Sequence, residues 1–322
     1  ASAMQIVLAD AGVPFNGLSP GLGPLGGAES AVVALAEALA AMGAEVTAYT
    51  RTESAVVHEG VRWLPLDSAA VANGDLLIAN RDPRLIGRFP ARRRVFWLHN
   101  PAGFMKKPRY LWPLLRHRPT VVFAGPHHRA TAPGWLPLRA ALIPLGTEPL
   151  FLTTPRAAPI PPPRLVFTSN PTRGLVPLAQ LFASLIRPQV PGAELHVFAG
   201  AQVYGADGAR AAAMSAALAT AAALPGVVIR GPLPKRDLAA ELAQARLMLY
   251  LGDVGETFCL ALAEAQAMGV PCVVRPVGAV GERVREGETG FIRSTDADLA
   301  DAAVALLRND ALWQHFSQNA LN

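Results

Sequence analysis

The chain has 322 residues, of which 51% are apolar and 16% are charged, and its formal net charge is +5. This composition excludes an intrinsically disordered chain, and two cysteines exclude a disulfide framework and a cysteine-rich zinc site. No run of 18 uncharged apolar residues occurs. Met4–Asp10 (MQIVLAD) is itself strand-like, so no signal peptide is expected there. We therefore expect a soluble, cytoplasmic protein with two domains.

Strand-like and helix-like segments alternate through the first half. Gln5–Asp10 (QIVLAD) predicts a buried strand, Ala28–Met42 an amphipathic helix and Glu45–Tyr49 a second strand. Further strands are expected at Asp75–Ala79, Arg94–Leu98, Thr120–Ala124 and Ala141–Pro144. Continuous apolar strands separated by helices are typical of a parallel sheet covered on both faces. Residues 1–150 therefore predict a doubly wound, Rossmann-like α/β domain.

Positive charge is concentrated in this first half. Residues 1–150 hold 15 Lys and Arg against 10 Asp and Glu, whereas residues 151–322 hold 14 of each. Within residues 81–139 there are 13 basic side chains and one acid, Asp82. Such a face attracts an anionic membrane surface or a phosphorylated acceptor, and a solvated basic surface is the alternative. No nucleic-acid-binding motif accompanies the charge, so nucleic acid is not expected as a partner.

The segment 151–163 contains TTPRAAPIPPP and predicts a stiff linker, because proline fixes the backbone and removes hydrogen-bond donors. Residues 164–322 then repeat the alternation of the first half. Strands are expected at Arg164–Thr168, Glu194–Ala199, Val227–Arg230, Leu247–Leu251 and Pro271–Arg275, and helices at Leu175–Leu185, Ala209–Leu224, Asp237–Ala245, Leu260–Met268, Thr295–Leu307 and Asp310–Asn319. Two consecutive doubly wound domains predict a cleft between the carboxyl ends of their sheets.

Residues 252–271, GDVGETFCLALAEAQAMGVP, form the most informative motif. Glu256 and Glu264 are eight residues apart, on either side of the point where a glycine turn enters a helix. The first turn of such a helix has free backbone N–H groups, which suit a phosphate. The expected amide donors and neighbours are Thr257, Phe258, Cys259 and Leu260. An ordinary strand-to-helix junction with two solvated glutamates is the alternative.

Ser169–Leu175 (SNPTRGL) follows the first strand of the second domain and holds the candidate cation Arg173. A guanidinium there would bind a pyrophosphate bidentately, assisted by Asn170. In the first domain, Gly26 and Gly27 begin a helix and allow a ligand to approach the backbone closely. His99 stands where a strand enters a loop, and its ring suits a sugar hydroxyl or a proton transfer, with backbone capping as the alternative.

These motifs resemble those of the retaining, GT-B-fold glycosyltransferases of family 4. The resemblance rests on the two glutamates of residues 252–271, the RGL segment at Arg173, the GGAE segment at Gly26, and Ile143–Gly146. It implies two Rossmann-like domains facing each other across a cleft. It also implies that Arg173, Asn170 and the helix amides bind a nucleotide-diphosphate sugar, and that Glu264 binds its ribose. Gly26 and Gly27 are likewise expected to contact this nucleotide sugar.

By the same resemblance, Glu256 and His99 act on the transferred sugar, and the acceptor is a glycan, a lipid-linked molecule or a small molecule. No cofactor and no metal are implied, and Asp296-Ala297-Asp298 is expected to begin a helix instead of binding a metal. The chain departs from the family at Thr168, where many members have a second basic residue, and at Cys259, where glycine is common.

Two other classes of function remain open from the sequence. Gly21–Gly26 matches G-x-G-x-x-G, which with Arg51 would suit an NADP-dependent oxidoreductase. About ten residues separate this match from the first strand, whereas a dinucleotide fingerprint needs a tight turn. The other class is a non-catalytic nucleotide-sugar-binding protein that keeps the fold without turnover.

Overall fold

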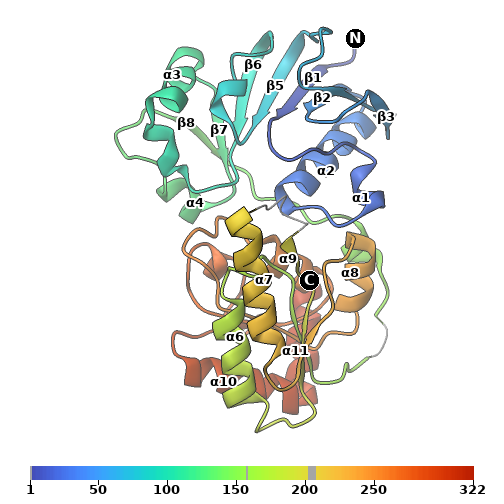
Figure 1. The fold of residues 1–322 in the computed structure, drawn as a ribbon, viewed down its shortest axis with the longest axis vertical. Helices are drawn as coiled ribbons and strands as arrows, with labels where there is room; N and C mark the ends of the chain where they lie inside the picture. Colours follow the sequence, from blue (N-terminus) through green and yellow to red (C-terminus); the bar gives the residue numbers. More distant parts are fainter. Residues whose placement is uncertain (1, 157–158, 202–207) are drawn as a thin grey trace. The chain divides into compact units, whose positions relative to one another are not determined.

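The structure, a computed structural model, describes residues 2–156, 159–201 and 208–322. The chain divides into two compact units, Ala1–Gly146 and Thr147–Asn322 (Figure 1). The segment predicted as a linker, 151–163, includes residues 157 and 158, which lie outside the described residues. Its beginning belongs to helix α5 (Leu150–Thr153), in which Phe151 is buried in the core of the second unit.

The first unit contains an eight-stranded sheet in the order β3-β4-β2-β1-β5-β6-β7-β8. All pairs are parallel except β3–β4, which is antiparallel. The strands are β1 (Gln5–Asp10), β2 (Glu45–Thr50), β3 (Val56–His58), β4 (Val61–Pro65), β5 (Gly74–Asn80), β6 (Ala91–Trp97), β7 (Thr120–Phe123) and β8 (Arg139–Leu142). The helices are α1 (Ser19–Leu22), α2 (Gly27–Ala41), α3 (Pro108–His117) and α4 (Pro126–Ala130).

The second unit contains a six-stranded, wholly parallel sheet in the order β11-β10-β9-β12-β13-β14. The strands are β9 (Arg164–Phe167), β10 (Glu194–Val197), β11 (Val227–Ile229), β12 (Leu247–Tyr250), β13 (Cys272–Val274) and β14 (Gly290–Ile292). The helices are α6 (Leu175–Leu181), α7 (Gly208–Ala222), α8 (Lys235–Leu242), α9 (Leu260–Ala267), α10 (Asp296–Arg308) and α11 (Asp310–Leu321).

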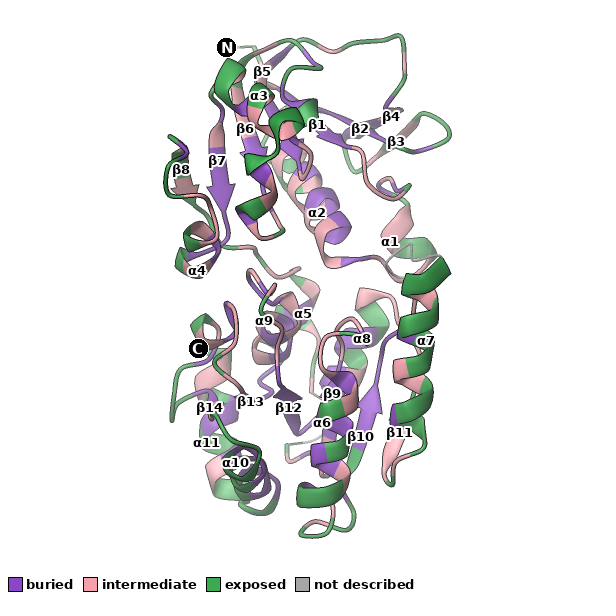
Figure 2. Ribbon diagram, turned by 60° about the vertical axis from the view of Figure 1, so that its left-hand side comes forward, coloured by how far each residue is buried: buried purple, intermediate pink, exposed green. Residues whose placement is uncertain are grey.

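Both sheets are doubly wound, and this part of the sequence prediction is confirmed. In each unit the strand order reverses beside the first strand, between β1 and β5 and between β9 and β12. Apolar side chains of the central strands form the cores, and Figure 2 shows these strands mostly buried. A reversal point leaves a crevice outside the carboxyl ends of its two strands, where ligands bind in folds of this kind.

Candidate functional site

In the second unit the candidate site lies at the reversal point between β9 and β12. The loop after β9 carries Arg173, and the loop after β12 carries Glu256. The Arg173 guanidinium Nη1 lies 2.9 Å from Glu256 Oε1, so the structure brings these two predicted residues together. Gly174 has φ +79° and Gly252 has φ +76°, a left-handed conformation that glycine adopts without strain. These glycines let the two loops turn back at the end of the sheet.

Glu256 is buried, and its second oxygen also has a partner. Tyr250, the last residue of β12, donates its hydroxyl to Glu256 Oε2 at 2.8 Å, and its oxygen lies 3.2 Å from Ser169 Oγ. Burial, together with the nearby Cys259 and Glu256, raises the pKa of Tyr250, so its phenol keeps its proton. Burial alone would lower the pKa of Arg173, but the nearby Glu256, Tyr250 and Asp253 together outweigh burial, and the net shift of the pKa is upward. Arg173 therefore keeps its positive charge in this network.

Helix α9 begins directly after this network, as the sequence predicts. Cys259, its N-cap, has φ +70°, a left-handed conformation that is uncommon for a residue with a Cβ. This explains in physical terms why a glycine suits the position. Cys259 and Phe258 are buried, and burial raises the pKa of the Cys259 thiol well above its usual value, so the thiol is not a nucleophile. Thr257 is half-buried between Glu256 and the helix.

The backbone of the Glu256 loop is fixed by Gly278. Ala279 donates its amide to the Glu256 carbonyl at 2.9 Å. Gly278 has φ +61°, and a Cβ placed there would lie 2.7 Å from the Asp253 carbonyl oxygen and 2.8 Å from that of Glu256. Backbone atoms cannot yield as a flexible side chain does, so any larger residue displaces the loop.

Gly278→Ala should therefore lower the free energy of unfolding of the second unit by about 1–3 kcal/mol and reduce turnover together with it. Gly281→Ala is the matched control, because nothing lies within 4 Å of a Cβ at that position. Urea unfolding and initial rates measure both quantities. Equal stability of the two variants would contradict this account of the loop.

Glu264, the second predicted glutamate, lies inside α9 and is buried. Lys235, the first residue of α8, places its ammonium Nζ 2.5 Å from Glu264 Oε1. Lys235 also lies over the Phe151 ring, 5.9 Å from its centroid. Lys235 was not identified from the sequence, because it stands 29 residues before Glu264 along the chain. The carboxylate is thus held by one ion pair on one oxygen.

Asn170, predicted to contact the donor, is engaged within its own loop. Its Oδ1 accepts from the Thr172 amide at 2.9 Å and from the Thr172 hydroxyl at 2.8 Å. The Arg173 amide donates to the Asn170 carbonyl at 2.9 Å. Asn170 therefore shapes the turn that presents Arg173.

The first unit has its own polar cluster at the reversal point between β1 and β5. Asp10 ends β1, and Arg81 follows β5. Arg81 donates Nε and Nη2 to the Asp10 carboxylate at 3.0 and 2.8 Å, and Nη1 to Glu29 Oε1 at 2.7 Å. Asn80 donates Nδ2 to Asp10 Oδ2 at 2.6 Å. Sequence reasoning did not identify this cluster, although each of Asp10, Asn80 and Arg81 is polar and stands at a strand end.

His99 extends this cluster. Its Nε2 lies 2.7 Å from Asn80 Oδ1, and that oxygen must accept because Asn80 Nδ2 donates to Asp10. The neutral ring therefore carries its proton on Nε2 and its lone pair on Nδ1. Burial, followed by the charges of Arg81 and His128, lowers the pKa of His99 to about 3. His99 is thus neutral at ordinary pH.

This pKa predicts an acid-sensitive first unit. Below about pH 6.5 the unfolded chain protonates His99, whereas the folded chain does not until about pH 3. The free energy of unfolding should therefore fall as the pH drops from about 6.5 toward 3, and His99→Gln should reduce this fall. His58→Gln, in the same unit, is the control. If the free energy of unfolding falls equally in His99→Gln and in the parent between pH 7 and pH 4, this prediction is wrong.

Gly26 and Gly27 lie at the N-terminus of α2, as predicted, with Gly26 as the N-cap. Glu29, in the first turn of the same helix, is the residue that contacts Arg81. The Gly21–Gly26 match does not form a tight strand-to-helix turn, because β1 ends at Asp10, α2 begins at Gly27 and α1 intervenes. This geometry does not favour dinucleotide binding.

Among the described residues, no group of three or more His, Cys, Asp or Glu side chains is placed to hold a metal ion. Asp296 and Asp298 lie in the first turn of α10, where Thr295 Oγ1 accepts from the Asp298 amide at 3.1 Å, as expected for a helix start. In residues 2–156, 159–201 and 208–322, no helix combines the length and apolar character needed to cross a bilayer.

Comparison with known proteins agrees with the geometry of the second unit. Residues 162–309, which contain Arg173, Glu256 and Glu264, match the family described as Glycosyl transferases group 1. This region therefore carries the sequence pattern of the group 1 glycosyl transferases. It is similar to N-acetyl-alpha-D-glucosaminyl L-malate synthase of Bacillus anthracis, with 38% identity over 91 residues, which are 27% of this chain and 24% of that protein. The matched stretches span no more than about a quarter of the curated relatives' lengths.

Solved structures of glycosyltransferases share the whole fold. Sucrose-phosphate synthase from Thermosynechococcus elongatus superposes with a TM-score of 0.75 at 20% identity, over 99% of this chain and 93% of that one. Anabaena HepE in complex with UDP and glucose gives 0.70 at 15% identity, over 99% and 94%. The chain therefore has the GT-B fold, as its sequence predicts.

Proposed function

We propose that this chain is a retaining glycosyltransferase of family 4 that transfers a sugar from a nucleotide-diphosphate sugar to a glycan, lipid-linked or small-molecule acceptor. The observation that carries the proposal is the Arg173–Glu256–Tyr250 network at the amino end of α9. It combines a cation, a buried carboxylate and free helix amides at the reversal point of a doubly wound sheet. Family membership of residues 162–309 supports the same reaction class.

The proposed mechanism uses only side chains and backbone amides. Arg173 and the amides of Phe258, Cys259 and Leu260 neutralise the leaving diphosphate, so that no metal is required. Glu264, held on one oxygen by Lys235, offers the other to the ribose hydroxyls. Glu256 stabilises the positive charge that develops on the transferred sugar. Neutral His99 is assigned to a hydroxyl of the transferred sugar.

We propose that transfer retains the configuration and proceeds by front-face attack. A double displacement requires a nucleophile beside the anomeric carbon, but the Glu256 carboxylate is already bound by Arg173 and Tyr250. Front-face transfer, with the leaving diphosphate assisting the acceptor, is the remaining route to retention. The anomeric configuration of the product, read by NMR, tests this step, and an inverted product would refute it.

Release of free nucleotide from UDP-, GDP- and ADP-sugars, measured with and without acceptor and with a chelator present, tests the function itself. UDP-glucose is the first donor to test, because HepE was solved with UDP and glucose. Acceptor-dependent release that is insensitive to chelator supports the proposal. Binding without release would instead identify a non-catalytic nucleotide-sugar-binding protein.

We also propose that the acceptor is met at an anionic membrane surface, to which α3 attaches peripherally. Its residues Arg109, Trp112 and Arg116 are exposed on one helical face, and the Trp112 side chain is 70% exposed. Leu114, on the opposite face, is buried in the core. An exposed tryptophan among basic side chains suits a lipid headgroup layer.

Trp112→Ala should weaken binding to vesicles that contain about one-third phosphatidylserine by roughly fivefold to tenfold, since burying part of the indole in the interface contributes on the order of 1 kcal/mol. Trp135→Ala is the matched control, because Trp135 is 63% exposed in the same unit but lies outside α3. Vesicle co-sedimentation measures the binding. Equal binding by Trp112→Ala and the parent would contradict this surface.

A further inference from the structure

The first unit contains a cavity to which the mechanism proposed above assigns no ligand. It has a volume of about 310 Å³ and lies at the carboxyl ends of β1, β5 and β6. Its lining residues are Ala11, Gly12, Asn80, Arg81, Asp82, Asn100, Phe104 and Tyr110. Pockets for small molecules measure about 300–1,000 Å³, so this one accommodates a single ring, not an oligosaccharide.

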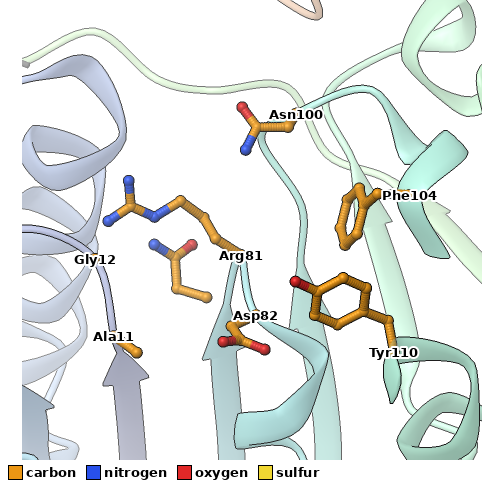
Figure 3. A pocket seen from close by; sticks show the side chains of 8 residues that line it. Ala11, Gly12, Arg81, Asp82, Asn100, Phe104 and Tyr110 are labelled. Carbon is orange, nitrogen blue, oxygen red and sulfur yellow. The ribbon is translucent and has the colours of Figure 1, made fainter. Parts of the chain in front are cut away.

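The walls of the cavity differ in chemistry. Figure 3 shows Phe104 and Tyr110 on one side, Ala11 and Gly12 on the other, and Arg81 and Asp82 between them. Phe104 and Tyr110 meet edge to face, with ring centroids 5.3 Å apart. Arg109 lies over the Tyr110 ring at 4.7 Å from its centroid, which fixes that ring from outside. The cavity thus offers a preformed aromatic wall opposite polar groups.

Arg81 is the one cation among the lining residues, and its charge is already neutralised. Asp10 and Glu29 both bind its guanidinium, so the three side chains together carry a charge of −1. A Cβ at Gly12 would lie 2.1 Å from Arg81 Nη2, so the backbone leaves the guanidinium no room to turn on that side. Asp82 is bound by Arg84 at 2.7 Å. Among the lining residues, an anionic ligand would therefore meet no cation that is not already paired.

We propose that this cavity binds the acceptor as an uncharged, polyhydroxylated ring, a hexose or a cyclitol, and that Glu29 excludes anionic acceptors by neutralising Arg81. Only the ligand's role as acceptor rests on the proposed function. The preference for a neutral polyol rests on the geometry of the cavity alone. Apolar C–H faces of the ring lie against Tyr110 and Phe104. Its hydroxyl groups bond to Asp82 and Asn100, which carry acceptors and donors at the rim.

Binding without donor tests the inference independently of turnover. Calorimetric titrations of the full chain with glucose and myo-inositol, and with glucose 6-phosphate and inositol 1-phosphate, compare neutral and anionic rings directly. The neutral compounds should bind at least about tenfold more tightly than their monophosphates. Equal or tighter binding of the monophosphates would overturn the proposal, as would no binding of any of the four compounds.

Substitutions of single residues test which side chains produce the preference for neutral rings. Glu29→Gln keeps a hydrogen bond to Arg81 but removes one negative charge, so it should reduce the preference for neutral rings by about tenfold. Glu53→Gln makes the same chemical change at an exposed position of the same unit and should leave the preference unchanged. Tyr110→Ala should weaken neutral-ring binding about tenfold, and Tyr110→Phe should weaken it less. An unchanged preference in Glu29→Gln would refute the role of Glu29.

The same variants separate this inference from the proposed function. Donor binding, measured as the shift in melting temperature with UDP-glucose, should be the same in the parent, Glu29→Gln and Tyr110→Ala, because Arg173 and the amino end of α9, to which the diphosphate is assigned, lie in the other unit. A chain that binds neutral rings but no nucleotide sugar would leave the cavity assignment intact and refute the transferase. A chain that transfers sugar equally well to monophosphates would refute the cavity assignment and leave the transferase intact.

Discussion

Arg173→Ala should lower the rate of sugar transfer by about a hundred- to a thousandfold, because the variant removes the cation that balances the leaving diphosphate. The chain has Thr168 where many family members have a second basic residue, so no side chain at that position can compensate. Steady-state rates with saturating acceptor measure the effect. The rate of Arg173→Lys should lie between those of the parent and Arg173→Ala, because an ammonium keeps the charge but loses the bidentate geometry.

Stability must be measured beside activity for this variant. Without Arg173, the buried Glu256 carboxylate keeps only its hydrogen bond from Tyr250, which should cost about 1–3 kcal/mol of unfolding free energy. Arg293→Ala is the matched control, because Arg293 forms a 2.6 Å ion pair with Glu286 and is 31% exposed, close to the 37% of Arg173. A similar loss of turnover in both variants would show that Arg173 acts through stability alone.

Glu256→Gln should lower turnover by about a hundredfold or more, with little change in the binding of the nucleoside diphosphate. The amide has the same shape and can still accept from Tyr250, but it provides no negative charge for the developing oxocarbenium ion. Because the charge develops only in the transition state, the loss should appear in kcat and leave donor KM nearly unchanged. Single-turnover rates and donor titrations separate the two effects.

Two further variants serve as controls for Glu256→Gln. Tyr250→Phe removes the hydroxyl that bonds to Glu256 Oε2 while leaving the Arg173 pair, so its effect should be smaller. Glu286→Gln neutralises the partner of Arg293 and should leave turnover unchanged. Parent-like kcat in Glu256→Gln would remove Glu256 from the mechanism.

Most of the fold was predictable because its central strands are continuous apolar runs. β1, β5, β9 and β12 all coincide with predicted strands within two residues at either end, since burial on both faces imposes an uninterrupted apolar sequence. The hairpin β3–β4 was not predicted, because its edge position leaves Val57 exposed and carries polar residues. Helix α3 was not predicted either, since prolines begin and interrupt it.

The site was predictable only where its residues share one short segment. The glutamates and the helix start lie within residues 252–271, and the strand-to-helix pattern identified them together. Arg173 was found from its position after a strand. Lys235, Tyr250 and the Asp10–Arg81 pair were missed, because strand order, which periodicity does not give, decides which strand ends become neighbours. Polar residues at the ends of predicted parallel strands are the signal that points to them.

The central claim is that Arg173 and the amino end of α9 hold the diphosphate of a nucleotide sugar. Isothermal titration of the parent and of Arg173→Ala with UDP-, GDP- and ADP-sugars, in the presence of a chelator, tests it most directly. We expect one of these donors to bind the parent without metal and at least about tenfold more weakly to Arg173→Ala, with Arg293→Ala unchanged. Equal affinity for the parent and Arg173→Ala would contradict the claim, as would binding of none of the donors.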